Sequence, residues 1–82
     1  MRATIAVVLE CCNNLNLHLR HLKAPWRAEL PYDSCTGWSF AIRGLNESGY
    51  KILVDGLTNR EIVYYMNGVF AGLRLPRDAD EG

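Results

Sequence analysis

The clearest alternation of apolar and polar positions lies in the middle of the chain. In WSFAIRGL, residues 38–45, the side chains of Trp38, Phe40 and Ile42 fall on one face, and YKILVDGL, residues 50–57, alternates in the same way. A period of two is typical of a strand that buries one of its faces. The stretch NESG between the two segments supplies turn residues. The pattern therefore predicts an antiparallel hairpin.

A helical period follows directly. From residue 58 to residue 73 apolar side chains recur three and four positions apart, with Ile62 and Met66 at the centre of the stripe. Thr58 and Glu61 have the spacing of a capping box, in which the threonine hydroxyl and the glutamate each accept a backbone amide proton. We expect an amphipathic helix that begins after Thr58 and lays its apolar stripe across one face of the sheet.

The first third of the chain has two interpretations. Its residues 2–12 contain several β-branched side chains and predict a strand from Ala3 to Leu9, but the same apolar positions also fit a helix, which stays the alternative. The following LNLHLRHL alternates leucine with polar residues and predicts another strand, with Asn13 and Asn14 in the turn before it. Two prolines interrupt residues 23–37, which we interpret as a long irregular connection.

These elements predict an α+β fold: a small antiparallel sheet of three or four strands packed by a C-terminal amphipathic helix. If the N-terminal segment is helical, the order becomes α-β-β-β-α. The 82 residues suffice for a single core. We assign residues 1–77 to one globular domain and residues 78–82 to a frayed acidic tail.

Composition narrows the class of protein. Nine basic residues balance nine acidic ones, so the whole molecule exerts no net field on nucleic acids or anionic membranes. No stretch approaches the ~20 apolar residues that span a bilayer, and the apolar part of MRATIAVVLE is short for a signal peptide. Three cysteines leave one over if two pair. We expect a cytoplasmic protein with reduced thiols that does not associate with membranes.

Residue types that bind metals or act as nucleophiles are present, but not at the spacing that such sites require. Cys11, Cys12, His18, His21 and Cys35 could in principle bind zinc, yet they lack the C-x2-C pair that preorganises two thiolates. No motif joins a nucleophile to a base, and there is no glycine-rich phosphate loop. We therefore predict no catalytic residues, no metal site and no cofactor.

The outer side of the predicted C-terminal helix is unusual for a surface exposed to water. It carries a single charge, a tyrosine and a glycine in the middle of the helix, where glycine costs about 1 kcal/mol relative to alanine. Glycine lets another surface approach the backbone, and tyrosine is enriched at binding hot spots. We predict a protein-binding patch that also includes two loop aromatics: Arg60, Tyr64, Asn67, Gly68, Trp26 and Tyr32. The alternatives are a solvated helix and a Gly68 packed within the domain.

Function follows from this patch as a hypothesis. We expect a small non-catalytic protein that binds another macromolecule, with a protein as the leading candidate, as an inhibitor or adaptor of the kind that phages and mobile elements encode. A second hypothesis is nucleic-acid binding by the basic and aromatic segment 18–27, through His18, Arg20, Lys23 and Arg27. A third is a homodimer that associates through the helix or a sheet edge.

Overall fold

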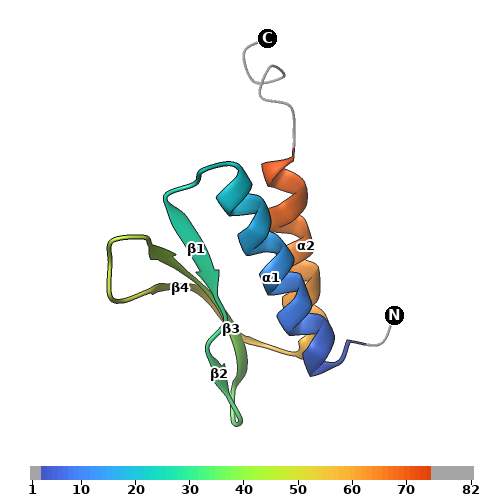
Figure 1. The fold of residues 1–82 in the computed structure, drawn as a ribbon. Coiled ribbons are helices and arrows are strands. Elements are labelled where there is room, and N and C mark those ends of the chain that lie inside the picture. Colours follow the sequence, from blue (N-terminus) through green and yellow to red (C-terminus); the bar gives the residue numbers. More distant parts are fainter. Residues whose placement is uncertain (1–2, 75–82) are drawn as a thin grey trace.

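The computed structural model describes residues 3–74 as two helices and four strands (Figure 1). In chain order they are α1 (Ile5–His21), β1 (Trp26–Glu29), β2 (Tyr32–Asp33), β3 (Gly37–Gly44), β4 (Lys51–Leu57) and α2 (Asn59–Leu73). The helices form one layer and the antiparallel sheet forms the other. The predicted α+β class is confirmed, in the version that begins with a helix.

β3 is the centre of the sheet. Both β1 and β2 pair antiparallel with it along one side, in registers that place Ala28 opposite Ile42 and Tyr32 opposite Trp38. β4 pairs with the other side, which confirms the predicted hairpin, although its register shifts on either side of Phe40. Such bulges bend an edge strand and make it a poorer template for a further strand.

One apolar cluster joins the two layers. It draws side chains from both helices and from β1 and β3: Val8, Leu15, Leu19, Ala28, Trp38, Phe40, Ile62, Val63 and Met66. Burying an aliphatic or aromatic side chain of this size stabilises a fold by roughly 1.5–3 kcal/mol. The predicted stripe of α2 therefore faces the sheet and α1.

The capping box of α2 is present as predicted. The Thr58 Oγ1 accepts a hydrogen bond from the Glu61 amide at 3.2 Å, and the Glu61 carboxylate accepts from the Thr58 amide at 2.9 Å. The helix ends at Leu73, and the acidic tail predicted for residues 78–82 lies outside the described residues. Among residues 3–74 no helix has both the length and the hydropathy needed to cross a membrane.

The strands predicted from Ala3 to Leu9 and in LNLHLRHL are wrong, because residues 5–21 form one helix. Val8, Leu15 and Leu19 lie on its buried side, whereas Leu17 is 59% exposed. The apparent alternation arose because Leu15 and Leu19 are four residues apart, which places them on one helical face, while Leu17 lies on another. Asn13 and Asn14 are consequently in the middle of a helix and not in a turn.

The prediction of one long irregular connection over residues 23–37 is also wrong, because this segment contains the strands β1 and β2. The prolines Pro25 and Pro31 lie just outside these strands, where no amide proton is needed for the ladder. Gly37 turns the chain into β3 with φ +100°, and a Cβ atom there would lie 2.6 Å from the carbonyl oxygen of Leu57. Only glycine satisfies both conditions.

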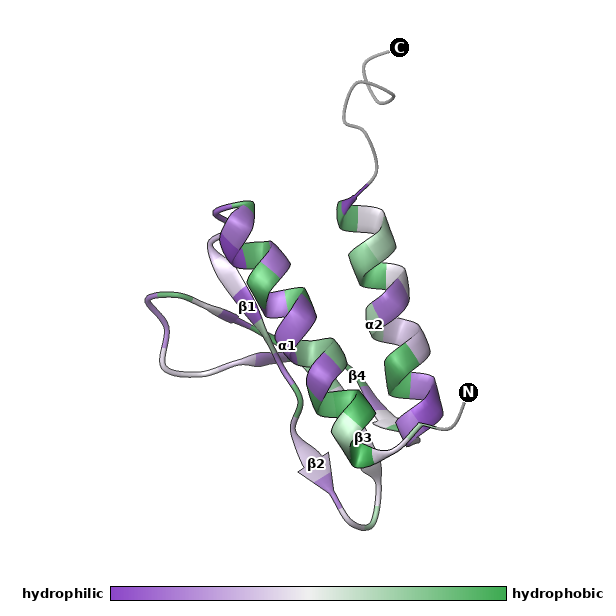
Figure 2. Cartoon of the chain, turned by 45° about the vertical axis from the view of Figure 1, so that its right-hand side comes forward, coloured by the Kyte–Doolittle hydropathy of each residue, from purple (hydrophilic) through white to green (hydrophobic). Residues whose placement is uncertain are grey.

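The two helices run side by side in the same direction (Figures 1 and 2). Near their first turns the Asn59 side chain donates a hydrogen bond to the Ala3 carbonyl at 3.2 Å. Near their last turns the rings of His18 and Phe70 pack with centroids 4.8 Å apart. Both C-terminal ends, which carry partial negative charge, therefore lie at the same end of the molecule.

Candidate functional site

The outer face of α2 is exposed, as the helical pattern predicts. Arg60, Tyr64, Asn67 and Gly68 all lie on it, and we call these four residues the α2 patch. The Tyr64 side chain is 55% exposed. The Arg60 guanidinium lies 5.6 Å from the centre of the Tyr64 ring and 3.4 Å from its hydroxyl. This contact between residues four apart orients the ring on the surface.

Gly68 is the centre of this face. A Cβ atom added there would meet no atom of the described chain within 4 Å, apart from the helix's own adjacent backbone. Packing of Gly68 against another described part of the domain is thereby excluded as its explanation. The glycine leaves a strip of helix backbone open to an approaching surface.

The two predicted loop aromatics lie on the sheet and far from each other. Trp26 is opposite Gly44, whereas Tyr32 is opposite Trp38, which precedes Gly44 by six residues in β3. Six residues of strand span roughly 20 Å. The structure therefore does not bring all six predicted residues into one patch.

Tyr32 belongs to the end of the sheet where α2 begins. Its ring packs on Trp38 with centroids 4.7 Å apart, and the Trp38 Nε1 donates to the Asn59 side chain at 2.6 Å. Asn59 is the first residue of α2 and precedes Arg60. Tyr32 can therefore extend the α2 patch only through Trp38 and the first turn of the helix.

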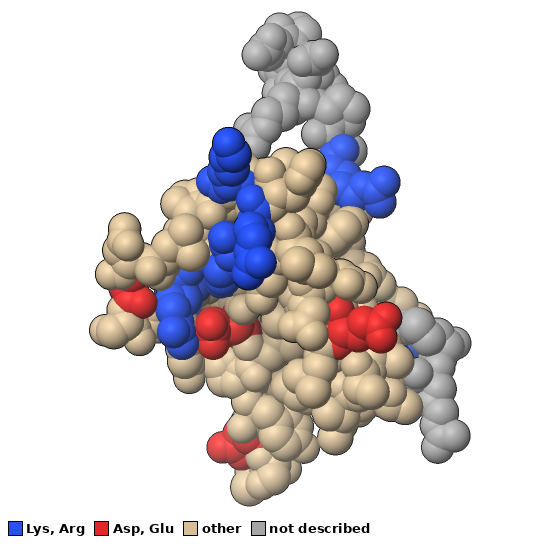
Figure 3. All heavy atoms as spheres, in the orientation of Figure 1, with Lys and Arg blue, Asp and Glu red and all other residues tan. Residues whose placement is uncertain are grey.

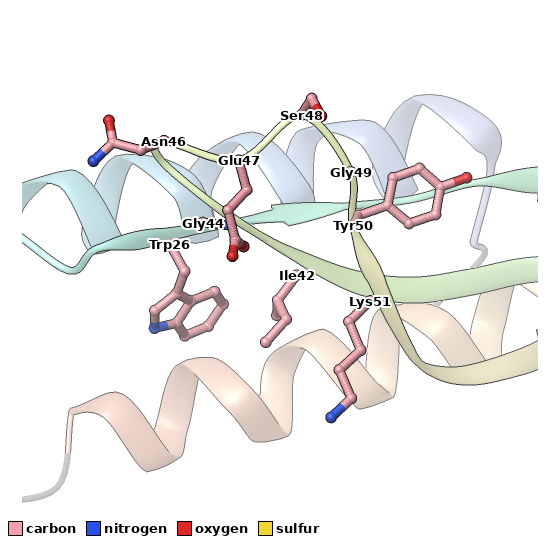
Figure 4. A pocket seen from close by; sticks show the side chains of 9 residues that line it. All are labelled: Trp26, Ile42, Gly44, Asn46, Glu47, Ser48, Gly49, Tyr50 and Lys51. Carbon is pink, nitrogen blue, oxygen red and sulfur yellow. The ribbon is translucent and has the colours of Figure 1, made fainter.

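Trp26 lines a different hollow, beneath the turn between β3 and β4. Figure 4 shows Trp26, Ile42 and Lys51 projecting from the sheet toward the side on which α2 lies. Glu47 reaches back from the turn and accepts a hydrogen bond from the Gly44 amide at 3.3 Å. The turn that frames the hollow is exposed.

The basic segment 18–27 divides between two surroundings. His18 packs on Phe70 between the helices, and its Nε2 has no hydrogen-bond partner within the described chain. Arg20 and Lys23 are exposed near the end of α1, and Arg27 lies on β1 opposite Arg43 of β3. Figure 3 shows a run of Lys and Arg side chains on this side of the molecule. Arg43 joins the predicted set, and His18 leaves it.

Asn16 is a structural residue that the pattern did not reveal. Its Nδ2 donates to the Ala28 carbonyl at 3.1 Å, and the Ala28 amide donates to its Oδ1 at 2.7 Å. The side chain thus pairs with the edge of β1 that faces away from β3, as another strand would. The sequence signal, an asparagine between Leu15 and Leu17, also fits a surface position and therefore could not identify it.

The cysteines do not form a reactive centre. Cys11 and Cys12 lie on α1, and Cys35 is exposed in the turn after β2; all three are free thiols. Burial, followed by the charge of Glu29, raises the pKa of Cys12, and burial together with Glu10 raises the pKa of Cys11. A raised thiol pKa lowers the thiolate fraction, which is the nucleophile.

The described residues also lack a cluster suited to a metal. Among residues 3–74 no three histidine, cysteine, aspartate or glutamate side chains converge on one point. Two surfaces with exposed side chains suited to binding are the α2 patch and the cationic surface formed by Arg20, Lys23, Arg27 and Arg43.

Comparison with known proteins finds no family model, curated protein or solved structure that matches this chain.

Proposed function

We propose that this chain is a non-catalytic protein that binds another protein through the α2 patch. It acts by occupying a surface of its partner, as an inhibitor or adaptor of the kind that phages and mobile elements encode. The observation that carries the proposal is the unoccupied space over Gly68, in a helix whose opposite side buries Ile62, Val63 and Met66.

The cost of that glycine supports the proposal. A glycine within an exposed helix destabilises the fold by about 1 kcal/mol relative to alanine, which is a substantial fraction of a small domain's stability. No described neighbour would collide with a methyl group at this position. The fold therefore does not require the glycine, whereas a partner that lies close to the helix backbone would.

Tyr64 provides the anchor next to this open backbone. Its ring offers a large apolar area with few rotatable bonds, and its hydroxyl gives a polar end. Arg60 holds the ring from the preceding turn, which reduces the conformational entropy lost on binding. Asn67 adds an amide that can both donate and accept hydrogen bonds beside the glycine.

The test is capture of a partner from a lysate of the source organism, with and without nuclease, by the wild-type chain and four variants. The free energy of unfolding of Tyr64→Ala should lie within about 0.5 kcal/mol of the wild-type value, because the residue is on the surface. The variant should nevertheless fail to capture the partner. Gly68→Ala should raise the free energy of unfolding by up to about 1 kcal/mol and still weaken capture. A more stable variant that binds less cannot be explained by misfolding.

Two further variants serve as controls. Gly72→Ala places the same methyl group one turn further along the helix, where it also meets no described atom within 4 Å, and should capture normally. Met66→Asp buries a charge in the core and should unfold the domain. Unchanged capture by both Tyr64→Ala and Gly68→Ala would refute the α2 patch, and capture that disappears with nuclease would refute a direct protein partner.

A further inference from the structure

A net charge of zero conceals an uneven distribution of charge within the described residues. The half of the molecule with the helix C-terminal ends and the β3–β4 turn carries six cations and two carboxylates: Arg20, Lys23, Arg27, Arg43, Lys51, Arg74, Glu29 and Glu47. The other half carries four carboxylates and one cation: Glu10, Asp33, Asp55, Glu61 and Arg60. Such a separation creates a local field that the total charge does not show.

Part of the positive half is shaped as a groove. Side chains from α1 and β1 line it together: Asn13, Asn16, Leu17, Arg20, Arg27 and Glu29. We call this the cationic groove. In Figure 3 it lies along the run of blue spheres beside α1, with one red carboxylate at its edge. Lys23 and Arg43 flank it, since Lys23 follows the end of α1 and Arg43 is paired with Arg27.

Two of the cations are held in place before any ligand arrives. The Arg27 guanidinium donates to the carbonyls of Ala24 and Trp26, at 2.9 and 2.7 Å. The Arg43 guanidinium contacts the Glu29 carboxylate at 3.3 Å. Both side chains retain donors beyond these contacts, because a guanidinium has five N–H groups. Preorganised cations lose less entropy when they bind an anion.

The groove also has an apolar component, which distinguishes between classes of anionic ligand. Leu17 is 59% exposed within it, and Leu22, between the exposed Arg20 and Lys23, is 44% exposed. Trp26 projects toward the opposite face of the sheet from Arg27, because adjacent strand residues alternate. The indole is therefore not available to stack a base beside these cations.

We propose that the cationic groove binds an acidic amphipathic segment of a partner protein. Carboxylates of that segment pair with Arg20, Lys23 and Arg27, and its apolar side chains contact Leu17. This surface shares no residue with the α2 patch, so the proposal does not depend on the function assigned to that patch. It gives the chain a second point of contact with a protein.

The test is fluorescence anisotropy with the full chain and a labelled peptide. The peptide has about a dozen residues, with glutamates and leucines spaced to share one helical face. Arg20→Glu should weaken its binding about tenfold or more at low salt, and Leu17→Asn should weaken it by a smaller factor. Arg20→Gln provides a neutral substitution in case the reversed charge disturbs the end of α1, and should also weaken binding.

Arg60→Glu is the matched control, since it makes the same change of charge at the other end of the molecule. It should alter peptide affinity less than about twofold at physiological salt, where the Debye length is about 8 Å. Tyr64→Ala should bind the peptide normally, and Arg20→Glu should still support capture by the α2 patch. The two proposals can therefore fail separately.

Three results would overturn the proposal. Equal losses in Arg20→Glu and Arg60→Glu would indicate a general electrostatic effect instead of a groove. No measurable binding of the peptide to the wild-type chain at low salt would remove the site. Tighter binding of single-stranded oligothymidylate or a DNA duplex than of the peptide, with the same dependence on Arg20, would assign the groove to nucleic acid.

Discussion

Replacing Asn16 by alanine tests how α1 is joined to the sheet. The asparagine side chain is the only described group that hydrogen-bonds both the amide and the carbonyl of Ala28 on the outer edge of β1. Ala28 is 3% exposed, so water cannot easily replace the lost partner. The substitution would therefore leave the Ala28 amide without a hydrogen bond and the Ala28 carbonyl with only the long contact from the Cys12 thiol, at 3.9 Å.

The magnitude follows from these two groups. A buried polar group left unsatisfied costs about 1–3 kcal/mol. The unpaired amide and the weakly paired carbonyl, offset by partial access of water and by the higher helix propensity of alanine, give an expected loss of about 1–3 kcal/mol. Small domains have total stabilities of about 5–15 kcal/mol. Asn16→Ala should thus fold, but with a clearly reduced midpoint of denaturation.

Urea denaturation followed by circular dichroism measures this loss, and two further variants identify its source. Asn16→Asp keeps an acceptor for the Ala28 amide but places a carboxylate against the Ala28 carbonyl, so it should destabilise the fold at neutral pH as well. Asn14→Ala changes an exposed asparagine in the same helix and should be neutral or slightly stabilising. Hydrogen exchange of the Ala28 amide should accelerate in Asn16→Ala relative to amides of β4.

An Asn16→Ala variant within about 0.5 kcal/mol of the wild type would refute this reasoning. It would mean that water satisfies the edge of β1, and that apolar packing alone holds α1 against the sheet. Unchanged exchange of the Ala28 amide would lead to the same conclusion without reference to global stability.

The remaining predictions concern titration and thiol reactivity. Hydrogen bonds from the amide and then the hydroxyl of Thr58 lower the pKa of Glu61 from its ordinary value of 4.5, so the stabilisation they give is complete above that value and is lost as the pH falls through the lower folded pKa. Glu61→Gln should therefore flatten the dependence of stability on pH in acid, as measured by thermal melts, and an unchanged dependence would contradict the capping argument. Cys35 should react first with iodoacetamide and Cys12 last, because Cys35 is exposed whereas burial raises the pKa of Cys12. Mass spectrometry over time gives the order, and early labelling of Cys12 would show that α1 opens.

The second half of the fold could be predicted because its signals are local and agree with each other. Thr58 and Glu61 mark the start of α2 by a contact within one turn. The apolar stripe through Ile62 and Met66 then fixes which side of the helix is buried. Two alternating segments joined by a short turn predict a hairpin in the same direct way. The exposed residues of the α2 patch follow from the same helical rotation.

The first half could not be predicted because its local signals favour the wrong structure. β-branched residues between Ala3 and Leu9 favour a strand, yet Val8 is completely buried as part of a helix. It belongs to the same buried cluster as Met66 and Phe40, which lie far away in the sequence. Tertiary packing thus overrides intrinsic propensity. β1 and β2 are short strands next to prolines, and their pairing with β3 is likewise a non-local contact.

The same difference between local signals and non-local contacts decides which parts of the candidate sites could be predicted. Arg60, Tyr64, Asn67 and Gly68 belong to one helix, so their common exposure depends only on its period. Trp26 and Tyr32 were grouped with them by residue type, and the register of β3 separates them. The cationic groove needs α1 and β1 to be neighbours, so a sequence that suggested two strands could indicate its charges but not its shape.

The two proposed surfaces lie on helices that share one core, and this limits how they can influence each other. Val8, Leu19 and Met66 are all part of the same buried cluster, so α1 cannot move relative to α2 without opening it. A small domain of this kind unfolds as a unit, and a ligand on either surface should raise its stability by binding only the folded state. Two ligands would then bind independently, unless their own charges interact across the molecule. Independent binding at a fixed separation is the property that an adaptor needs, whereas an inhibitor requires only one of the two surfaces.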